Sequence, residues 1–124
     1  MDEISIQIPA RPEFVPVLRS VIASVASRMD LSFDGIDDLR LAVDEAAGHL
    51  LRLDRTATTL ELRIEPGADR IEVTSAIDAT PSVWPPEDAE HTLTWQVLTG
   101  LTDEASFDEV GGRPAITFVK RTPS

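Results

Sequence analysis

The amino-acid sequence predicts a two-layer α/β sandwich, in which helices cover one face of a mainly antiparallel sheet. Short segments that alternate polar and apolar residues indicate half-buried strands near both ends and in the middle of the chain. Longer segments between them carry apolar residues at helical spacing. The predicted order is strand, helix, helix, strand, strand, loop, helix, strand, strand, within one domain that spans residues 1–124.

The first predicted strand is residues 3–8, where isoleucines alternate with polar residues. Prolines follow it, and Pro12 suits the first position of a helix. From residue 14 the apolar period becomes helical, and a second helix is predicted over residues 34–53 with Asp34 as its N-cap. The residues expected to be buried are Phe14, Val17, Leu18, Val21, Ile22, Val25 and Met29 in the first helix and Ile36, Leu39, Val43, Ala46, Leu50 and Leu53 in the second.

The rest of the chain predicts a hairpin, a long loop, one more helix and a second hairpin. Turn residues separate the alternating segments, and the loop contains prolines and acids but has no periodicity. In the third helix, Leu93, Val97, Leu98 and Leu101 are expected to be buried. The predicted ranges are strands 59–65 and 70–77, loop 78–91, helix 92–101, and strands 105–110 and 115–120 with a turn at Gly111 and Gly112.

The composition argues against several classes of function. The sequence has 22 acidic and 11 basic residues, and its net charge of −11 disfavours direct binding to nucleic acid and suits a basic partner. It has no cysteine and only two histidines, which argues against disulfides, thiolate chemistry and a metal site built on several histidines. No apolar run is long enough to span a membrane, and the acidic N-terminus is unlike a secretory leader, so a cytoplasmic protein is expected.

The second predicted helix carries the most informative polar pair. Glu45 and His49 are four residues apart and therefore lie on one face of the helix. The pair is either an exposed acid–imidazole pair or part of a pocket in which Glu45 acts as a general base, for which small neighbouring residues leave room. The spacing alone leaves both interpretations open.

The stretch Leu39–Ala46, Leu-Arg-Leu-Ala-Val-Asp-Glu-Ala, resembles the N-box of the RsbW/SpoIIAB anti-sigma-factor serine kinases, which belong to the GHKL superfamily of histidine-kinase-like ATPases. Other segments, in the same order, are similar to the actinobacterial branch of that family (RsbW, also called UsfX), and the resemblance covers nearly the whole chain. It implies the histidine-kinase-like ATPase (Bergerat) fold. The other segments are Ala10–Val15, Val25–Met29, Leu93–Glu104 and Ile116–Arg121.

The resemblance also implies an ATP site, from which this sequence departs. Glu45 matches the acid that activates the attacking hydroxyl, but His49 replaces the asparagine that holds Mg²⁺, and a neutral imidazole is a poor ligand for this ion. The glycine-free segment Ser75–Ser82 replaces an Asp-x-Gly-x-Gly motif, with Asp78 as the candidate for a shifted remnant of the adenine-binding acid. Residues 83–90 stand where the family has a glycine-rich ATP lid, and the acids of this segment repel triphosphate.

From these departures we expect the ATP lid and ATP-dependent kinase activity to be lost. No cofactor is expected; the alternative is Mg·ATP bound by Glu45, His49 and Asp78, and Glu45 is catalytic only if kinase activity is retained. Trp84, in the lid segment, is expected to pack over the emptied nucleotide cleft, with an exposed partner anchor as the alternative. Trp95 is expected to lie in the core.

The resemblance implies partners as well. In the family an arginine of the first helix contacts the sigma factor, and Arg19 matches it, with a solvated arginine as the alternative. The expected function is an anti-sigma factor that sequesters an alternative sigma factor and is released by an anti-anti-sigma protein with a STAS domain. The alternatives are an active serine kinase that phosphorylates the STAS antagonist, and an adaptor that binds STAS or phosphatase partners without a sigma factor. A homodimer is also expected.

Overall fold

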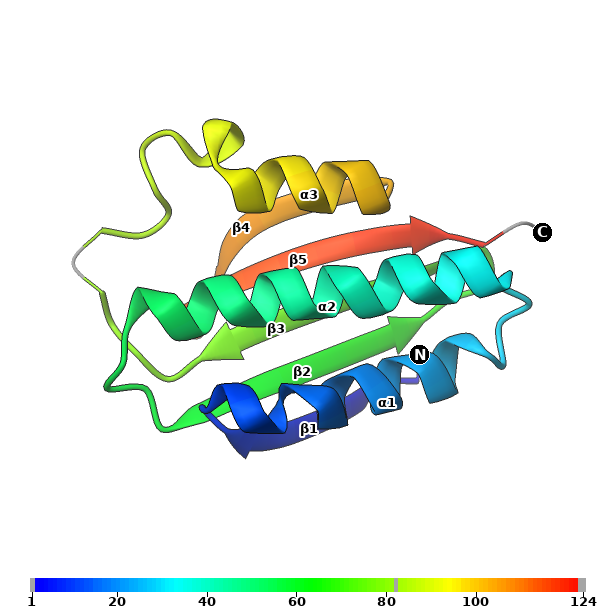
Figure 1. Ribbon diagram of the computed structural model, residues 1–124, viewed down its shortest axis with the longest axis horizontal. Helices are drawn as coiled ribbons and strands as arrows, with labels where there is room; N and C mark the ends of the chain where they lie inside the picture. Colours follow the sequence, from blue (N-terminus) through cyan, green and yellow to red (C-terminus); the bar gives the residue numbers. More distant parts are fainter. Residues whose placement is uncertain (1, 82, 123–124) are drawn as a thin grey trace.

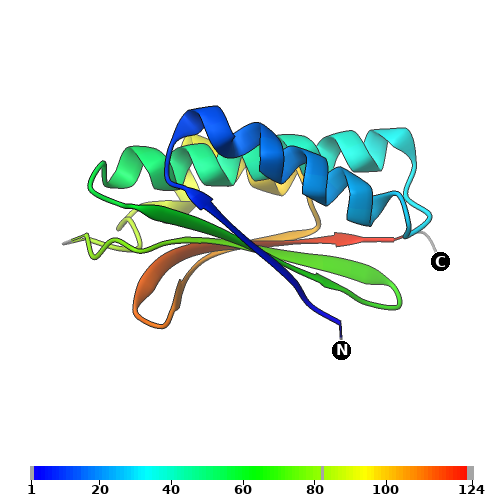
Figure 2. The same cartoon turned by 90° about the horizontal axis from the view of Figure 1, so that it is seen from below.

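Residues 2–81 and 83–122 are described by a computed structural model, and within them three α-helices lie on one face of a five-stranded sheet (Figure 1). Turned by 90°, the chain shows its two layers, with the helices above and the sheet below (Figure 2). The two-layer α/β sandwich predicted from the sequence is thus confirmed. Ser82, at the end of the segment Ser75–Ser82, lies outside the described residues, as do Met1, Pro123 and Ser124.

The strands of the sheet are β1 (Ile4–Pro9), β2 (Thr59–Pro66), β3 (Arg70–Ile77), β4 (Glu104–Val110) and β5 (Arg113–Arg121). Their order is β1-β2-β3-β5-β4, and every neighbouring pair is antiparallel. This order places β1 and β4 at the two edges of the sheet. Gly111 and Gly112 form the two-residue turn between β4 and β5, where their φ angles of 58° and 78° favour glycine.

The helices are α1 (Val15–Ala26), α2 (Phe33–Leu53) and α3 (Leu93–Leu101), and the short 3₁₀ segments η1 (Pro12–Phe14) and η2 (Ala89–His91) precede α1 and α3. α2 lies between α1 and α3 (Figure 1). The prediction of Asp34 as its N-cap is wrong: the Ser32 hydroxyl accepts the Gly35 amide hydrogen at 3.1 Å, and Asp34 lies in the first turn. Within the described ranges, no helix is both long and apolar enough to cross a bilayer.

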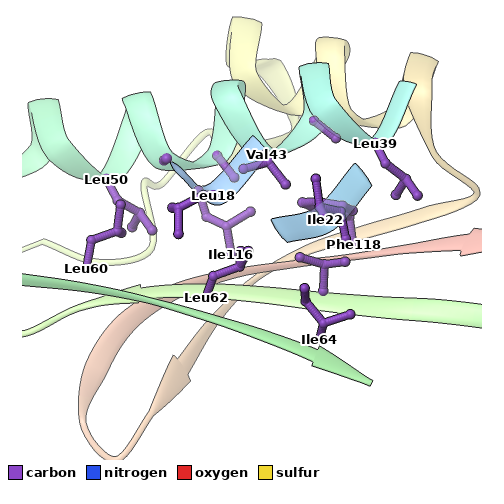
Figure 3. Close-up of a cluster of buried hydrophobic side chains, with 14 of the residues drawn as sticks. Leu18, Ile22, Leu39, Val43, Leu50, Leu60, Leu62, Ile64, Ile116 and Phe118 are labelled. Carbon is purple, nitrogen blue, oxygen red and sulfur yellow. The ribbon is translucent and has the colours of Figure 1, made fainter. Parts of the chain in front are cut away.

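The core lies between the helices and the sheet. One side of α1 and one side of α2 face the inward side chains of β2, β3 and β5 (Figure 3). Alternate residues of the strands point to this side, so the period-2 and helical patterns of the sequence meet in one layer. Its large, fully buried side chains include Leu18, Ile22, Leu39, Leu50, Leu60, Leu62, Ile64, Ile116 and Phe118.

Two residues that the helical patterns predict to be buried are exposed instead. Val17 in α1 is 43% exposed, because Leu18 and Ile22, one turn apart, define the buried face of that helix. Leu93, the first residue of α3, is 72% exposed, because the inward face of α3 begins at Thr94 and continues one turn later at Leu98. This inward position of Thr94 brings a hydroxyl to α2.

Candidate functional site

The polar pair of α2 is joined through a residue of α3. Thr94 is 3% exposed, and its hydroxyl donates a hydrogen bond to Glu45 Oε2 at 2.8 Å. The Thr94 hydroxyl oxygen, Oγ1, also lies 2.9 Å from His49 Nδ1. Because the hydroxyl gives its one proton to Glu45, His49 donates from Nδ1 to Thr94. Glu45 and His49 therefore both bind Thr94, and the three side chains tie α3 to α2.

The charge state of His49 follows from its surroundings. Burial lowers the pKa of His49 below its ordinary value of 6.5, the nearby Arg52 lowers it further, and Glu45 raises it by a smaller amount. The imidazole is therefore neutral at pH 7. In that state it keeps the Nδ1 proton that it donates to Thr94, so the hydrogen-bonded chain is complete at neutral pH.

An aromatic cluster fills the space beside His49. The cluster is His49 of α2, Trp84 of the loop before α3, Trp95 of α3 and Phe107 of β4. The rings of Trp84 and Phe107 stack with their centroids 5.4 Å apart and 20° between their planes, and the His49 ring lies 5.9 Å from the first and 5.5 Å from the second. Trp84 Nε1 donates to the Asp108 carbonyl oxygen at 2.8 Å. Trp84 is therefore packed against the chain rather than exposed as a partner anchor.

Trp95 completes the cluster from the other side. Its ring meets Phe107 edge-on, with the centroids 6.0 Å apart and 85° between the planes, an arrangement that aromatic pairs favour. Its side chain is half-buried rather than fully buried. Trp95 therefore packs at the margin of the core, which is less deep than the sequence predicts.

Asp78 binds the chain where β2 begins. Its carboxylate accepts hydrogen bonds from the Thr58 hydroxyl and from the amides of Thr58 and Thr59, the two amide bonds measuring 2.8 and 3.2 Å. The Thr58 hydroxyl is the main cause that holds the pKa of Asp78 at about 2, below its ordinary value of 3.8. Both carboxylate oxygens are thus engaged by the chain itself, which reduces their capacity to accept an adenine amino group.

The residues that the resemblance assigns to Mg·ATP do not fit that ligand as they are arranged. Glu45 accepts the Thr94 proton, His49 packs beside Trp84, and Asp78 binds the threonines where β2 begins. Trp84 comes from the segment that stands where the ATP lid is expected, and it packs beside His49 of α2. Among residues 2–81 and 83–122, no group of three or more His, Cys, Asp or Glu side chains could hold a metal ion.

A groove lies where α1 packs against α2. This groove has a volume of about 610 Å³. Arg19, Arg52 and Arg55 line it together with one acid, Asp44, and we call it the arginine groove. The apolar residues that line it are Ala10, Pro12, Val15, Pro16 and Leu51.

Arg19 makes a weak ion pair at the edge of the arginine groove. Its Nε lies 3.3 Å from Asp44 Oδ1, with the two side chains 42% and 36% exposed, and the buried Nε forms no hydrogen bond among the described residues. Burial raises the pKa of Asp44 above its ordinary 3.8 and outweighs the lowering by Arg19. A partly exposed pair of this kind contributes little stability, so Arg19 can exchange Asp44 for an acid of a partner.

Several residues that complete these two regions were not identified from the sequence. Thr94 belongs to a hydrophobic helix and Phe107 to a short strand. The spacing of residues in these segments does not indicate that either side chain contacts α2. Arg52 and Arg55 offered a readable signal, because two basic residues stand close together where the predicted helix 34–53 ends and the turn after it begins. The pairing of these arginines with Arg19 depends on the packing of α1 against α2.

Comparison with known proteins agrees with the resemblance. A family model described as the histidine kinase-like ATPase domain matches residues 8–120. The anti-sigma-F factor RsbW of Mycobacterium tuberculosis (strain H37Rv) is 32% identical over 115 residues, which cover 91% of this chain and 66% of that protein. The serine-protein kinase RsbW of Bacillus subtilis (strain 168) is 37% identical over 76 residues, which cover 58% of this chain and 47% of that protein. The matched regions therefore span just under two thirds of the first relative and about half of the second.

Proposed function

The chain belongs to the histidine kinase-like ATPase domain family, and on this premise we propose that it is an anti-sigma factor that sequesters an alternative sigma factor. In this proposal an anti-anti-sigma protein with a STAS domain competes for the chain and releases the sigma factor. Its relatives support the proposal, since they include an anti-sigma-F factor and a serine-protein kinase, both called RsbW.

The observation that carries the proposal is the contrast between the two sides of α2. On the side of α1, Arg19 lines an open groove and has only a weak partner in Asp44. On the side of α3, Glu45 and His49 are bound by Thr94 of the same chain. In this proposal an anti-sigma factor uses the side of α1 to bind its partner, whereas a kinase also needs free catalytic groups on the side of α3.

The chain then holds the sigma factor without ATP-dependent phosphorylation. A general base must direct a carboxylate oxygen at the attacking hydroxyl, and the hydrogen bond from Thr94 holds one of the two Glu45 oxygens toward α3 instead. A triphosphate also needs donors around it, and the segment that stands for the lid supplies prolines, acids and Trp84. Release of the sigma factor then depends on competition by the STAS protein rather than on phosphorylation of that protein.

An active serine kinase remains the second candidate, and one observation favours it. The Glu45 side chain is 23% exposed and lines a shallow groove between α2 and α3, where a partner's hydroxyl can approach. The assay is to incubate the chain with its STAS antagonist and Mg·ATP and to look for phosphoserine by mass spectrometry. Phosphoserine that forms with the wild-type chain and is absent with Glu45→Gln would establish the kinase and refute the loss of phosphorylation.

The test of the anti-sigma role is co-purification of the tagged chain with the proteins of its own cell. We expect one alternative sigma factor to be retained, and Arg19→Glu to weaken its binding by about tenfold or more. The control is Arg28→Glu, just beyond the C-terminal end of α1, where the Arg28 side chain bonds only to Ser24 among the described residues. The affinity of this variant for the sigma factor should stay within about twofold of wild type. Capture of a STAS or phosphatase partner without any sigma factor would support the adaptor instead and refute the anti-sigma role.

A homodimer is part of the proposal. β1 is an edge strand of the sheet, and Ile4 on it is 37% exposed. An open edge that carries an apolar side chain is a surface on which a second copy can pair. Light scattering of the purified chain would give the mass of a dimer, and a substitution of Ile4 by lysine should shift that mass toward the monomer; a monomeric wild-type chain would refute this part.

A further inference from the structure

The arginine groove is locally basic on a protein that is strongly acidic. The whole sequence has twice as many acids as bases, 22 against 11, whereas three arginines and one acid line this groove. The arginines come from separate places: Arg19 from α1, Arg52 from the last turn of α2, and Arg55 from the turn that follows. A local reversal of the overall charge favours a partner whose contacting segment is acidic.

Arg52 and Arg55 contribute little to holding the fold together. The Arg52 side chain is 69% exposed, and its nearest acid, Glu45, lies 3.9 Å away, at the limit of an ion pair. Arg55 is exposed, and within residues 2–81 and 83–122 it forms no salt bridge. Two of the three guanidinium groups in the groove can therefore bind carboxylates of a partner without losing strong contacts within the chain.

The surface between these arginines fits a protein segment better than a small anion. Pro12, Val15 and Leu51 line the groove with apolar atoms, and its volume of about 610 Å³ is far more than one phosphate fills. Apolar residues next to arginines have the composition of the anchoring part of a protein interface. The occupant that suits this surface carries apolar side chains together with carboxylates.

We propose that the arginine groove receives an acidic, partly apolar segment of the sigma factor, and that Arg52 and Arg55 bind carboxylates of that segment. The identity of the partner rests on the proposed function, whereas the chemistry of the groove does not. Two residues of the α2 end thereby join Arg19 as determinants of partner choice. A guanidinium can bind a carboxylate through two hydrogen bonds, which makes each position selective for acids.

The test is titration calorimetry of the full chain with the sigma factor that co-purifies with it. We expect the double variant Arg52→Glu/Arg55→Glu to weaken binding by about 10- to 100-fold, and Arg52→Gln/Arg55→Gln to weaken it less. Arg28→Glu, a control that reverses one charge outside the groove, stays within about twofold. Circular dichroism checks that each variant is folded, and a folded double variant that binds as tightly as the wild type would overturn the inference.

A peptide probe separates failure of this inference from failure of the proposed function. A synthetic amphipathic helix of leucines and glutamates is titrated into the isotope-labelled chain, alongside the same helix with lysines in place of glutamates. The acidic helix should shift the amide resonances of Val15, Leu51 and Arg55, and the basic helix should not. If the chain binds no sigma factor, the proposed function is wrong, and this titration tests the chemistry of the groove by itself. Shifts caused by the acidic helix alone would support that chemistry. Shifts that are absent, or that both helices cause, would overturn the inference.

Discussion

The two sides of α2 differ in how far the chain satisfies its own polar groups. On the side of α3, Glu45 and His49 share the Thr94 hydroxyl, and Trp84 packs against the imidazole. On the side of α1, Arg19 and Arg55 line an open groove with weak partners or none among the described residues, and Arg52 lines both this groove and the one beside α3. A polar group that already has a good partner gains little net free energy from a ligand, whereas an unsatisfied one can gain more. The comparison therefore favours the arginine groove as the side that binds.

The two sides also differ in what a substitution should change. The side of α3 is held by half-buried rings and by hydrogen bonds, which contribute to the free energy of unfolding. The side of α1 is held by exposed charges, which contribute little to folding and much to association. Substitutions beside α3 should therefore lower stability, and substitutions beside α1 should change affinity at unchanged stability.

The largest change in stability is expected for Trp84→Ala. It removes the stack with Phe107, the contact with His49 and the hydrogen bond to the Asp108 carbonyl. We expect the free energy of unfolding to fall by about 2 kcal/mol, less than for a fully buried tryptophan, as measured by urea denaturation. Trp84→Phe, which keeps a ring, should lose less than half of this. A loss below about 0.5 kcal/mol for Trp84→Ala would show that the aromatic cluster does not hold the loop.

A smaller loss is expected for Thr94→Val, which keeps the shape of the side chain but removes the hydroxyl. Glu45 and the Nδ1 proton of His49 then lose their shared partner at a part-buried site. The free energy of unfolding should fall by about 1–2 kcal/mol, while Thr94→Ser, which keeps the hydroxyl, should lose clearly less. Equal losses in the two variants would mean that the methyl group matters rather than the hydrogen bonds.

A still smaller effect is expected from the titration of His49. Its folded pKa lies below the ordinary value of 6.5, so between pH 7 and the folded pKa the unfolded chain binds more protons than the folded one. Stability should therefore fall on acidification through this window, and only slightly, because the side chain is half-buried and solvent screens its charge. Urea denaturation at several pH values measures it, and His49→Gln should flatten the curve. An unchanged slope in that variant would assign the pH dependence to other groups.

Asp78 gives a pH effect that is separate from that of His49. Its folded pKa of about 2 lies below the ordinary 3.8, so its contribution is full above pH 5 and is lost as the pH falls toward 2. Asp78→Asn should remove this acid-side loss without altering the slope above pH 5. A slope change near neutral pH in this variant would contradict the separation of the two windows.

The smallest change in stability is expected for Asp44→Asn, on the side of α1. Burial of the carboxylate offsets its attraction to Arg19, so the free energy of unfolding should stay within about 0.5 kcal/mol of wild type. The affinity for the sigma factor should rise, because Arg19 no longer has to leave Asp44. A loss of affinity would mean that Asp44 itself contacts the partner.

The sequence contains enough to predict the layers and most of the elements of this fold. Its alternating strands and helical stripes persist over several turns, and such patterns follow directly from which side of an element is buried. Val17 and Leu93 show the limit, because residues at the margin of a stripe depend on how the helix is rotated against its neighbours. The N-cap of α2 shows another: Ser32 and Asp34 are both good capping residues, and local preference does not choose between them.

The candidate site was less predictable than the fold. Glu45, Trp84 and Arg19 could be identified because they stand in recognisable strings or are unusual residues for their segments. The Thr94 bridge could not, because residues 45 and 94 meet only when α3 has a particular position along α2. The overall charge predicts a basic partner, whereas the groove between α1 and α2 is locally basic. The net charge of a sequence is a sum over all residues, and it does not show how folding distributes acids and bases over separate surfaces.

The most direct test of the central claim is the affinity of the chain for its sigma factor, measured with and without Mg·ATP. If binding belongs to the arginine groove and the other side of α2 is filled by the chain's own residues, the two affinities should agree within about twofold. Arg19→Glu should weaken both equally. Binding that requires Mg·ATP, or that changes by about tenfold or more when it is added, would contradict the account, because the nucleotide would then enter the side that Trp84 and Thr94 occupy.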